Sequence, residues 1–77
     1  MKDLLIYIVS HLVDDPDSVE VIERESEDGS LVLELHVAKD DIGKVIGRQG
    51  RIAKEIRVLV KSLAQRQDKR VNVDIVD

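Results

Sequence analysis

Hydrophobic residues at the beginning of the chain recur with the period of a helix. Between Lys2 and Val13 they stand three or four positions apart, at Leu4, Leu5, Ile8, Val9 and Leu12. This spacing is typical of an amphipathic helix with one buried face. Pro16 has no backbone N–H with which to continue such a helix, so we expect the helix to end before it.

The next two apolar segments alternate with polar residues and predict a β-hairpin. Alternation begins in Val19–Glu23 and continues through Leu31–Val37. One face of the second segment carries Leu31, Leu33, Leu35 and Val37, and the other carries Val32, Glu34 and His36. The turn Glu27–Ser30 contains Asp-Gly, which suits the positive φ of a tight hairpin turn. A last strand is predicted where Val71, Val73 and Ile75 alternate with Asn72 and Asp74.

Between the hairpin and the last strand the helical period returns. Asp40 and Asp41 are carboxylates of the kind favoured at a helix N-terminus, and a short helix with Ile42, Val45 and Ile46 should follow and end at Gly47. A second helix is predicted from about Arg51 to about Gln65. On a helical wheel its apolar arc contains Ile52, Ile56, Leu59, Val60 and Leu63, and nearly opposite lie Arg51, Lys54, Arg57 and Lys61.

The order α-β-β-α-α-β predicts an α+β fold, with a three-stranded sheet and the helices packed on one face. We expect one domain over residues 1–77, because a chain of 77 residues has room for a single core. The other sheet face should meet water, since it carries Glu20, Glu34, His36, Asn72 and Asp74. A core this small leaves association with a partner open.

Charge is unevenly distributed along a chain whose net charge is −4. Residues 39–70 hold ten Lys or Arg against four Asp or Glu, a local charge of +6, while the remainder carries −10. An acidic protein with such a segment can still attract a polyanion. Cysteine is absent, and only His11 and His36 could add to the carboxylates as metal ligands, so we expect no bound metal. We also expect no cofactor and no enzymatic activity. Without a membrane span or a signal peptide, a soluble cytoplasmic protein is expected.

The two central helices are joined by Gly47-Arg48-Gln49-Gly50. Glycine at both ends permits positive φ and close approach to the backbone, and the free N–H groups of the second helix would point into the loop as an anion site. The alternative interpretation is that the glycines only cap helices and the basic residues are a solvated face. The spacing fits neither the P-loop nor the dinucleotide-binding pattern.

The stretch Ile42–Ile52, IGKVIGRQGRI, resembles the I-G-x-x-I-G-x-x-G-x-x-I signature of the KH domain. Its position after a helix and a hairpin resembles the type II, prokaryotic arrangement. The whole chain is similar to the small bacterial KH proteins of the KhpA (YlqC) family. This resemblance implies binding of single-stranded RNA, self-association, and pairing with a larger KH-containing protein of the KhpB (Jag, EloR) type.

In the KH mode a GXXG loop clamps four backbone nucleotides. The resemblance therefore implies RNA contacts by the loop residues Gly47, Arg48, Gln49 and Gly50, by Lys44, Arg51 and Lys54, and by Gly43, Val45 and Ile46 along an aliphatic groove. Stacking of bases on several aromatic side chains is excluded, because the chain has one Tyr and no Phe or Trp. We expect a post-transcriptional regulator or RNA chaperone. The alternative is a KH-shaped interaction module that works mainly by homo- or heterodimerisation.

Overall fold

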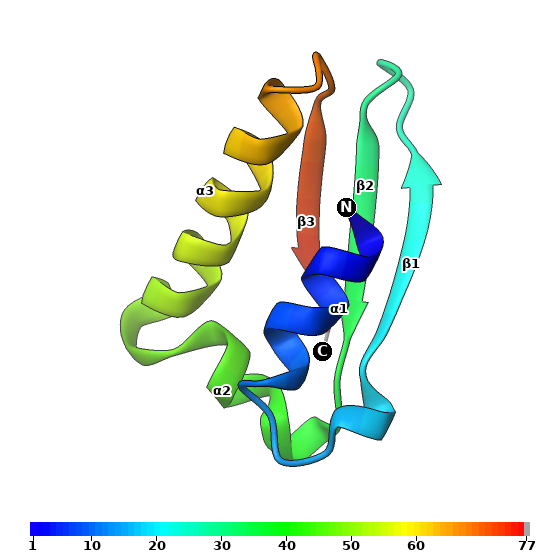
Figure 1. Ribbon diagram of the computed structural model, residues 1–77. Helices are drawn as coiled ribbons and strands as arrows, with labels where there is room; N and C mark the ends of the chain where they lie inside the picture. The colour runs from blue at the N-terminus through cyan, green and yellow to red at the C-terminus, as the bar shows by residue number, and fades with distance from the viewer. Residues whose placement is uncertain (77) are drawn as a thin grey trace.

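The computed structural model describes residues 1–76, and its elements follow the predicted order α-β-β-α-α-β (Figure 1). The helices and strands are α1 (Lys2–Ser10), β1 (Glu20–Glu25), β2 (Leu31–His36), α2 (Ile42–Ile46), α3 (Arg51–Gln65) and β3 (Val71–Ile75). Short 3-10 turns are η1 (Pro16–Ser18), η2 (Lys39–Asp41) and η3 (Arg48–Gly50). Within the described chain, none of the helices has the length and hydrophobicity needed to span a membrane.

The three strands form one mixed sheet in the order β1-β2-β3. Strand β2 is central: it pairs antiparallel with β1 and parallel with β3, so that Leu33 lies opposite both Glu23 and Val73. A parallel pair needs a long crossover, and here α2 and α3 provide it. The GXXG loop therefore lies in the crossover between two strands that are neighbours in the sheet.

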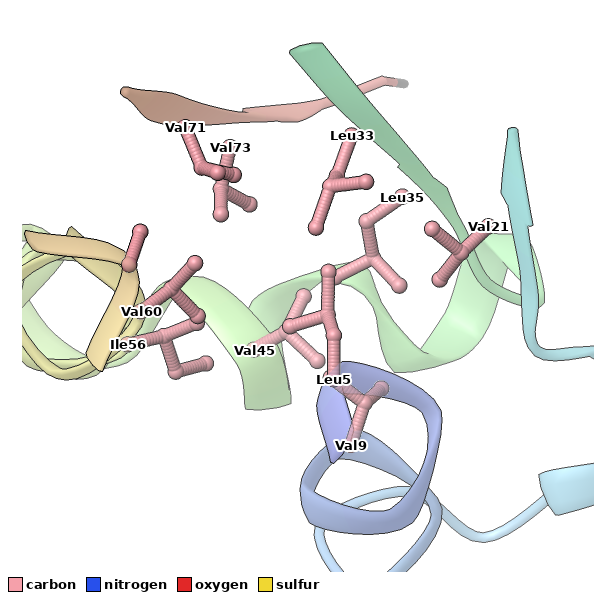
Figure 2. Packing of buried hydrophobic residues seen from close by; sticks show 11 residues of the cluster. Leu5, Val9, Val21, Leu33, Leu35, Val45, Ile56, Val60, Val71 and Val73 are labelled. Atoms are coloured by element: carbon pink, nitrogen blue, oxygen red, sulfur yellow. The ribbon is translucent and has the colours of Figure 1, made fainter. Parts of the chain in front are cut away.

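One face of the sheet packs against all three helices (Figure 2). Leu33 and Leu35 of β2 are completely buried at its centre. The helices contribute Leu5 and Val9 from α1, Val45 from α2, and Ile56, Val60 and Ala64 from α3. Full burial of a side chain such as Leu33 contributes about 1.5–3 kcal/mol to folding. The predicted α+β fold with helices on one sheet face is thus confirmed.

Helix α1 is shorter than predicted: it ends at Ser10 rather than Val13. The N–H groups of His11 and Leu12 bond to carbonyls three residues back, at 3.2 and 2.9 Å, which tightens the last turn and diverts the chain. Pro16 does not stop this helix; it begins η1, whose first position accepts a residue without an N–H.

The buried face of α3 also differs from the predicted arc. Ala53, Ile56, Val60 and Ala64 are buried, whereas Leu59 is 45% exposed and Val58 is 56% exposed. At 100° per residue the buried face is rotated by about 60° toward the two alanines. Small side chains there let the helix backbone approach the sheet closely, so Arg57 lies beside the buried face rather than opposite it, and its Nε donates to the carbonyl oxygen of Val73 at 3.2 Å.

The hairpin connection is an ordered loop of five residues between Glu25 and Leu31. Gly29 has φ +85°, as its predicted turn position requires. The Asp28 carboxylate accepts a hydrogen bond from the Ser26 hydroxyl, and others from the Ser30 N–H at 3.0 Å and the Ser30 hydroxyl at 2.6 Å. These bonds, that of Ser26 above all, hold the pKa of Asp28 far below its usual range, so this carboxylate stays ionised at any physiological pH.

The outer face of the sheet is largely polar, as predicted. Arg24 of β1 pairs with Glu34 of β2, and its hydrogen bond is the main reason why the pKa of Glu34 is lowered. Two apolar residues interrupt this face: Ile22 is 43% exposed, while Val32 is buried between its neighbours.

Candidate nucleic-acid interface

The reversal between α2 and α3 depends on Gly47. Its backbone has φ 75° and ψ 178°, a region that is open essentially to glycine alone. A Cβ atom at this position would lie 2.6 Å from Cγ1 of Ile52, the second residue of α3. Both the backbone conformation and the packing of Ile52 therefore require glycine, which explains the first glycine of the GXXG loop structurally.

The second half of the loop adopts left-handed backbone conformations. Gln49 has φ 58° and ψ 25°, and Gly50 has φ 75° and ψ 13°. A left-handed non-glycine residue costs about 1–2 kcal/mol, and strain of this kind is concentrated at functional loops. The conformation leaves the side chains of Arg48 and Gln49 exposed at the tip of the reversal.

Helix α3 begins directly after this loop, and no side chain caps its first turn in the described chain. The Arg51 N–H donates to the carbonyl oxygen of Arg48 in the preceding 3-10 turn. The next N–H groups at the start of a helix have no partner four residues back, and the helix N-terminus carries a positive partial charge. Beside them lies a hollow lined by Arg48, Gln49, Arg51 and Ile52. Among residues 1–76, no carboxylate lies within 4.0 Å of the basic groups of Arg48, Arg51 or Lys54. The geometry offers an anion a helix N-terminus and unpaired cations together.

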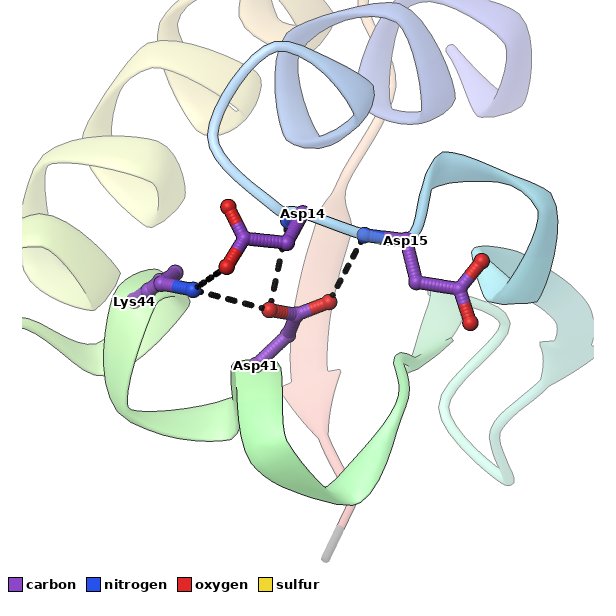
Figure 3. A network of polar contacts seen from close by, with 4 residues as sticks. All are labelled: Asp14, Asp15, Asp41 and Lys44. Carbon is purple, nitrogen blue, oxygen red and sulfur yellow. Dashed lines mark hydrogen bonds and ion pairs between the residues drawn. The ribbon is translucent and has the colours of Figure 1, made fainter.

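Lys44 is situated differently from these cations. Its Nζ contacts the carboxylate of Asp14 and lies 3.2 Å from Oδ1 of Asp41 (Figure 3). Both hydrogen bonds, that to Asp14 first, raise the pKa of Lys44. Its charge is therefore already paired within the domain, and the contact with RNA expected of Lys44 stays a prediction that has to compete with these two carboxylates.

Asp41 anchors α2 to the segment that follows α1. Its side chain is only 3% exposed, and its two oxygens accept the N–H groups of Asp14 at 3.2 Å and Asp15 at 3.0 Å (Figure 3). Burial opposes ionisation, but the two N–H groups and Lys44 outweigh it and lower the pKa of Asp41. Sequence reasoning placed Asp41 at a helix N-terminus and missed this role, because its partners lie 26 and 27 residues away.

The aliphatic residues predicted to form a groove are not equally accessible. Val45 is completely buried in the core and offers no surface in this conformation. Ile46 and Ile52 are half-buried and pack against the core with part of their surface free. Gly43 lies on the exposed side of α2, where a Cβ would meet nothing within 4 Å in the described chain. The accessible part of the predicted groove is therefore Ile46 and the backbone at Gly43, and Ile52 adds half-buried apolar surface.

The family of the chain follows from comparison with known proteins. Residues 2–75 match the model of the family described as KhpA/KhpB, KH domain. The chain belongs to this family. It is 54% identical over 76 residues to RNA-binding protein KhpA of Clostridium acetobutylicum, covering 99% of this chain and all of that one. It is 47% identical over 77 residues to RNA-binding protein KhpA of Listeria monocytogenes, with both chains fully covered.

The chain also shares its fold with part of a solved structure to which it has little sequence similarity. The chain resembles part of a crystal structure of Aquifex aeolicus Era with a TM-score of 0.59 and 16% identity. The match covers 96% of this chain and 28% of that one. At this identity the likeness concerns the fold alone.

We expect Gly47→Ala to destabilise the domain more than Gly50→Ala does. Alanine at Gly47 meets a glycine-only backbone region and collides with Ile52, for a loss of about 3 kcal/mol. Alanine at Gly50 meets open space and only the left-handed penalty of about 1 kcal/mol. Urea unfolding of the two variants measures the difference, and equal losses would contradict the proposed role of Ile52.

We expect Asp41→Asn to lower the midpoint of thermal unfolding at pH 7, with Asp40→Asn, an exposed neighbour, as its control. Because folding lowers the pKa of Asp41, the ionised carboxylate stabilises the fold above its unfolded pKa, and this contribution is lost as pH falls through the folded pKa. The gap between wild type and Asp41→Asn should be full above about pH 5 and shrink below about pH 4. A gap that is independent of pH would contradict this assignment.

Proposed function

We propose that this protein is a non-enzymatic cytoplasmic protein that binds single-stranded RNA through the loop Gly47–Gly50. The observation that carries the proposal is the uncapped N-terminus of α3, placed beside the unpaired guanidinium groups of Arg48 and Arg51. The similarity to proteins named RNA-binding protein KhpA supports RNA as the polyanion. A role as post-transcriptional regulator or RNA chaperone fits a small domain without catalytic machinery.

In this proposal the loop holds the phosphates and the neighbouring surface accepts the bases. Backbone N–H groups at the start of α3 and the side chains of Arg48 and Arg51 contact the phosphates, and Lys54 extends the positive field by one helical turn. Gly43 lets the RNA backbone pass close to α2, and Ile46 provides apolar surface for a base. Val45 supports this surface from the core, and Lys44 exchanges its carboxylate partners for a phosphate only at a cost.

Binding by one copy should be weak, since a GXXG loop contacts about four nucleotides. Each neutralised phosphate of a single strand contributes about 0.7 to the log–log slope of affinity against salt. A dimer would raise the effective concentration of the second loop once the first is bound.

We expect Arg48→Asp combined with Gln49→Asp to abolish binding of short single-stranded RNA while leaving the fold intact, because both side chains are exposed. The chain contains its own control, Arg66→Asp with Gln67→Asp, since the same Arg-Gln pair stands exposed after α3. Fluorescence anisotropy with a random pool of single strands of about four nucleotides measures binding. Equal affinity of the two double variants would sink the proposal for the loop.

A second candidate function is dimerisation through the exposed side of α3. Val58 and Leu59 are 56% and 45% exposed and line one surface hollow with Arg51, Lys54, Glu55 and Ser62. Apolar residues next to both Lys54 and Glu55 suit a two-fold interface, in which the lysine of one copy meets the glutamate of the other. The occupant we propose is a second copy of this chain, and a larger KH-containing protein of the KhpB type could take the same place.

We expect the wild type to sediment as a dimer, and Val58→Asp combined with Leu59→Asp to sediment as a monomer that retains its circular dichroism spectrum. Tyr7→Asp with Leu12→Asp is the matched control, because it charges two other exposed apolar residues, on and just after α1. Sedimentation velocity over a range of concentrations distinguishes the three proteins. A monomeric wild type, or a dimer that survives the α3 substitutions, would refute this interface.

A further inference from the structure

A hollow of about 300 Å³ lies at the end of α3 that is far from the GXXG loop. It is bounded by the last turns of α3, the β1–β2 loop and the start of β3, which meet at one end of the molecule (Figure 1). Its charged lining residues are Lys61, Lys69, Arg70 and Asp28, and Gln65 and Asn72 add amide groups. None of these residues belongs to the candidate interface described above.

The two cations contributed by the α3–β3 connection are held in place by the backbone. The Lys69 N–H donates to the carbonyl oxygen of Ala64 at 3.0 Å, and the Arg70 carbonyl oxygen accepts the N–H of Leu31 at 2.9 Å. Nη2 of Arg70 also donates to the carbonyl oxygen of Asp28 at 3.2 Å. The guanidinium group has five N–H donors, so this bond orients it and leaves donors for a ligand.

The hollow has an excess of positive charge that its own residues do not neutralise. Among residues 1–76, Asp28 is the one acidic residue in the lining, and its carboxylate is hydrogen-bonded to Ser26 and Ser30. Its Oδ2 also lies 4.0 Å from Nη2 of Arg70, so it offsets one of the three cations. Lys61 and Lys69 have no carboxylate within 4.0 Å among residues 1–76. Cations gathered around one hollow repel each other, and a bound phosphate would relieve that repulsion.

Basic residues on α3 connect this hollow with the GXXG loop. Arg57 donates to the β3 carbonyl of Val73, and Lys61 shares the hollow with Val71 at the beginning of the same strand. Both therefore lie on the side of α3 that faces β3. Ten residues of helix separate Arg51 from Lys61, or about 15 Å. The positive flank of the helix thus runs from one candidate phosphate site to the other.

We propose that the hollow lined by Lys61, Lys69 and Arg70 is a second phosphate site for the same single-stranded RNA, beyond the nucleotides held at the GXXG loop. This inference rests on the proposed function. The backbone of a polymer fits the lining better than a free nucleotide does, because within residues 1–76 the hollow has no aromatic side chain and its one apolar residue, Val71, is buried. A strand that reaches both sites gains from the effective concentration of the second contact.

The test uses two double variants. The hollow variant carries Lys61→Gln and Lys69→Gln, and the control variant carries Lys2→Gln and Arg66→Gln, which remove the same charge from exposed positions outside the hollow. Single strands of about four and about twelve nucleotides from one random pool are titrated by fluorescence anisotropy at several salt concentrations. We expect the hollow variant to bind the longer RNA about tenfold more weakly, with a salt slope reduced by about 1.4, and the shorter RNA with wild-type affinity. The control should keep wild-type affinity for both.

Three results would overturn the inference. If the hollow variant binds the longer RNA as tightly as the wild type does, there is no second site. If the control variant loses as much affinity as the hollow variant, the effect is one of net charge alone. The binding of inorganic phosphate or uridine monophosphate to the hollow is measured from the amide shifts of Lys69 and Asn72 in NMR spectra. If either small anion binds as tightly as the longer RNA does, the hollow is a small-anion site. If the wild type binds RNA of neither length, the proposed function itself fails, which is a separate outcome.

Discussion

Ile52 packs so closely on Gly47 that no side chain fits at that position, and the candidate interface is built around this contact. The contact brings the end of α2 and the beginning of α3 together across a reversal of four residues, Gly47–Gly50. The reversal exposes Arg48 and Gln49 and leaves the first turn of α3 without a side-chain cap. A packing constraint inside the domain thus shapes the candidate anion site on its surface, and Gly47, which permits this packing, is required by the fold itself.

The charges around this contact are divided between structure and surface. Asp41 and Asp14 pair with Lys44, which fixes α2 against the segment after α1. The cations at the loop and along α3 are left without acidic partners in the part of the chain that the structure describes. This division explains how a protein with net charge −4 can present a positive strip, because most of its carboxylates lie outside residues 39–70.

Local pattern was enough to predict the elements of the fold and the reversal, but not the contacts between distant residues. Helix α3 occupies the predicted Arg51–Gln65, since its period, its glycine boundary and its length are all local properties. Burial of Asp41 could not be predicted, because it depends on N–H groups 26 and 27 residues away. The wheel for α3 was wrong by about 60° because hydrophobicity alone favoured Leu59 over Ala53 and Ala64. Ala53 and Ala64 are buried instead, because small side chains let the helix pack closely against the sheet.

That rotation of α3 gives one helix three different surfaces. The alanines, Ile56 and Val60 face the sheet, which turns Val58 and Leu59 outward and brings Arg57 to the edge of β3. Had Leu59 been buried as the wheel predicted, Arg57 would point into solvent on the opposite side. The apolar patch and the basic flank are thus two consequences of the same packing choice. Arg57 and Lys61 lie beside β3, so association through Val58 and Leu59 would leave this part of the flank open to RNA. Arg51 and Lys54 line the same hollow as Val58 and Leu59, so the RNA and the second copy would meet at these two residues.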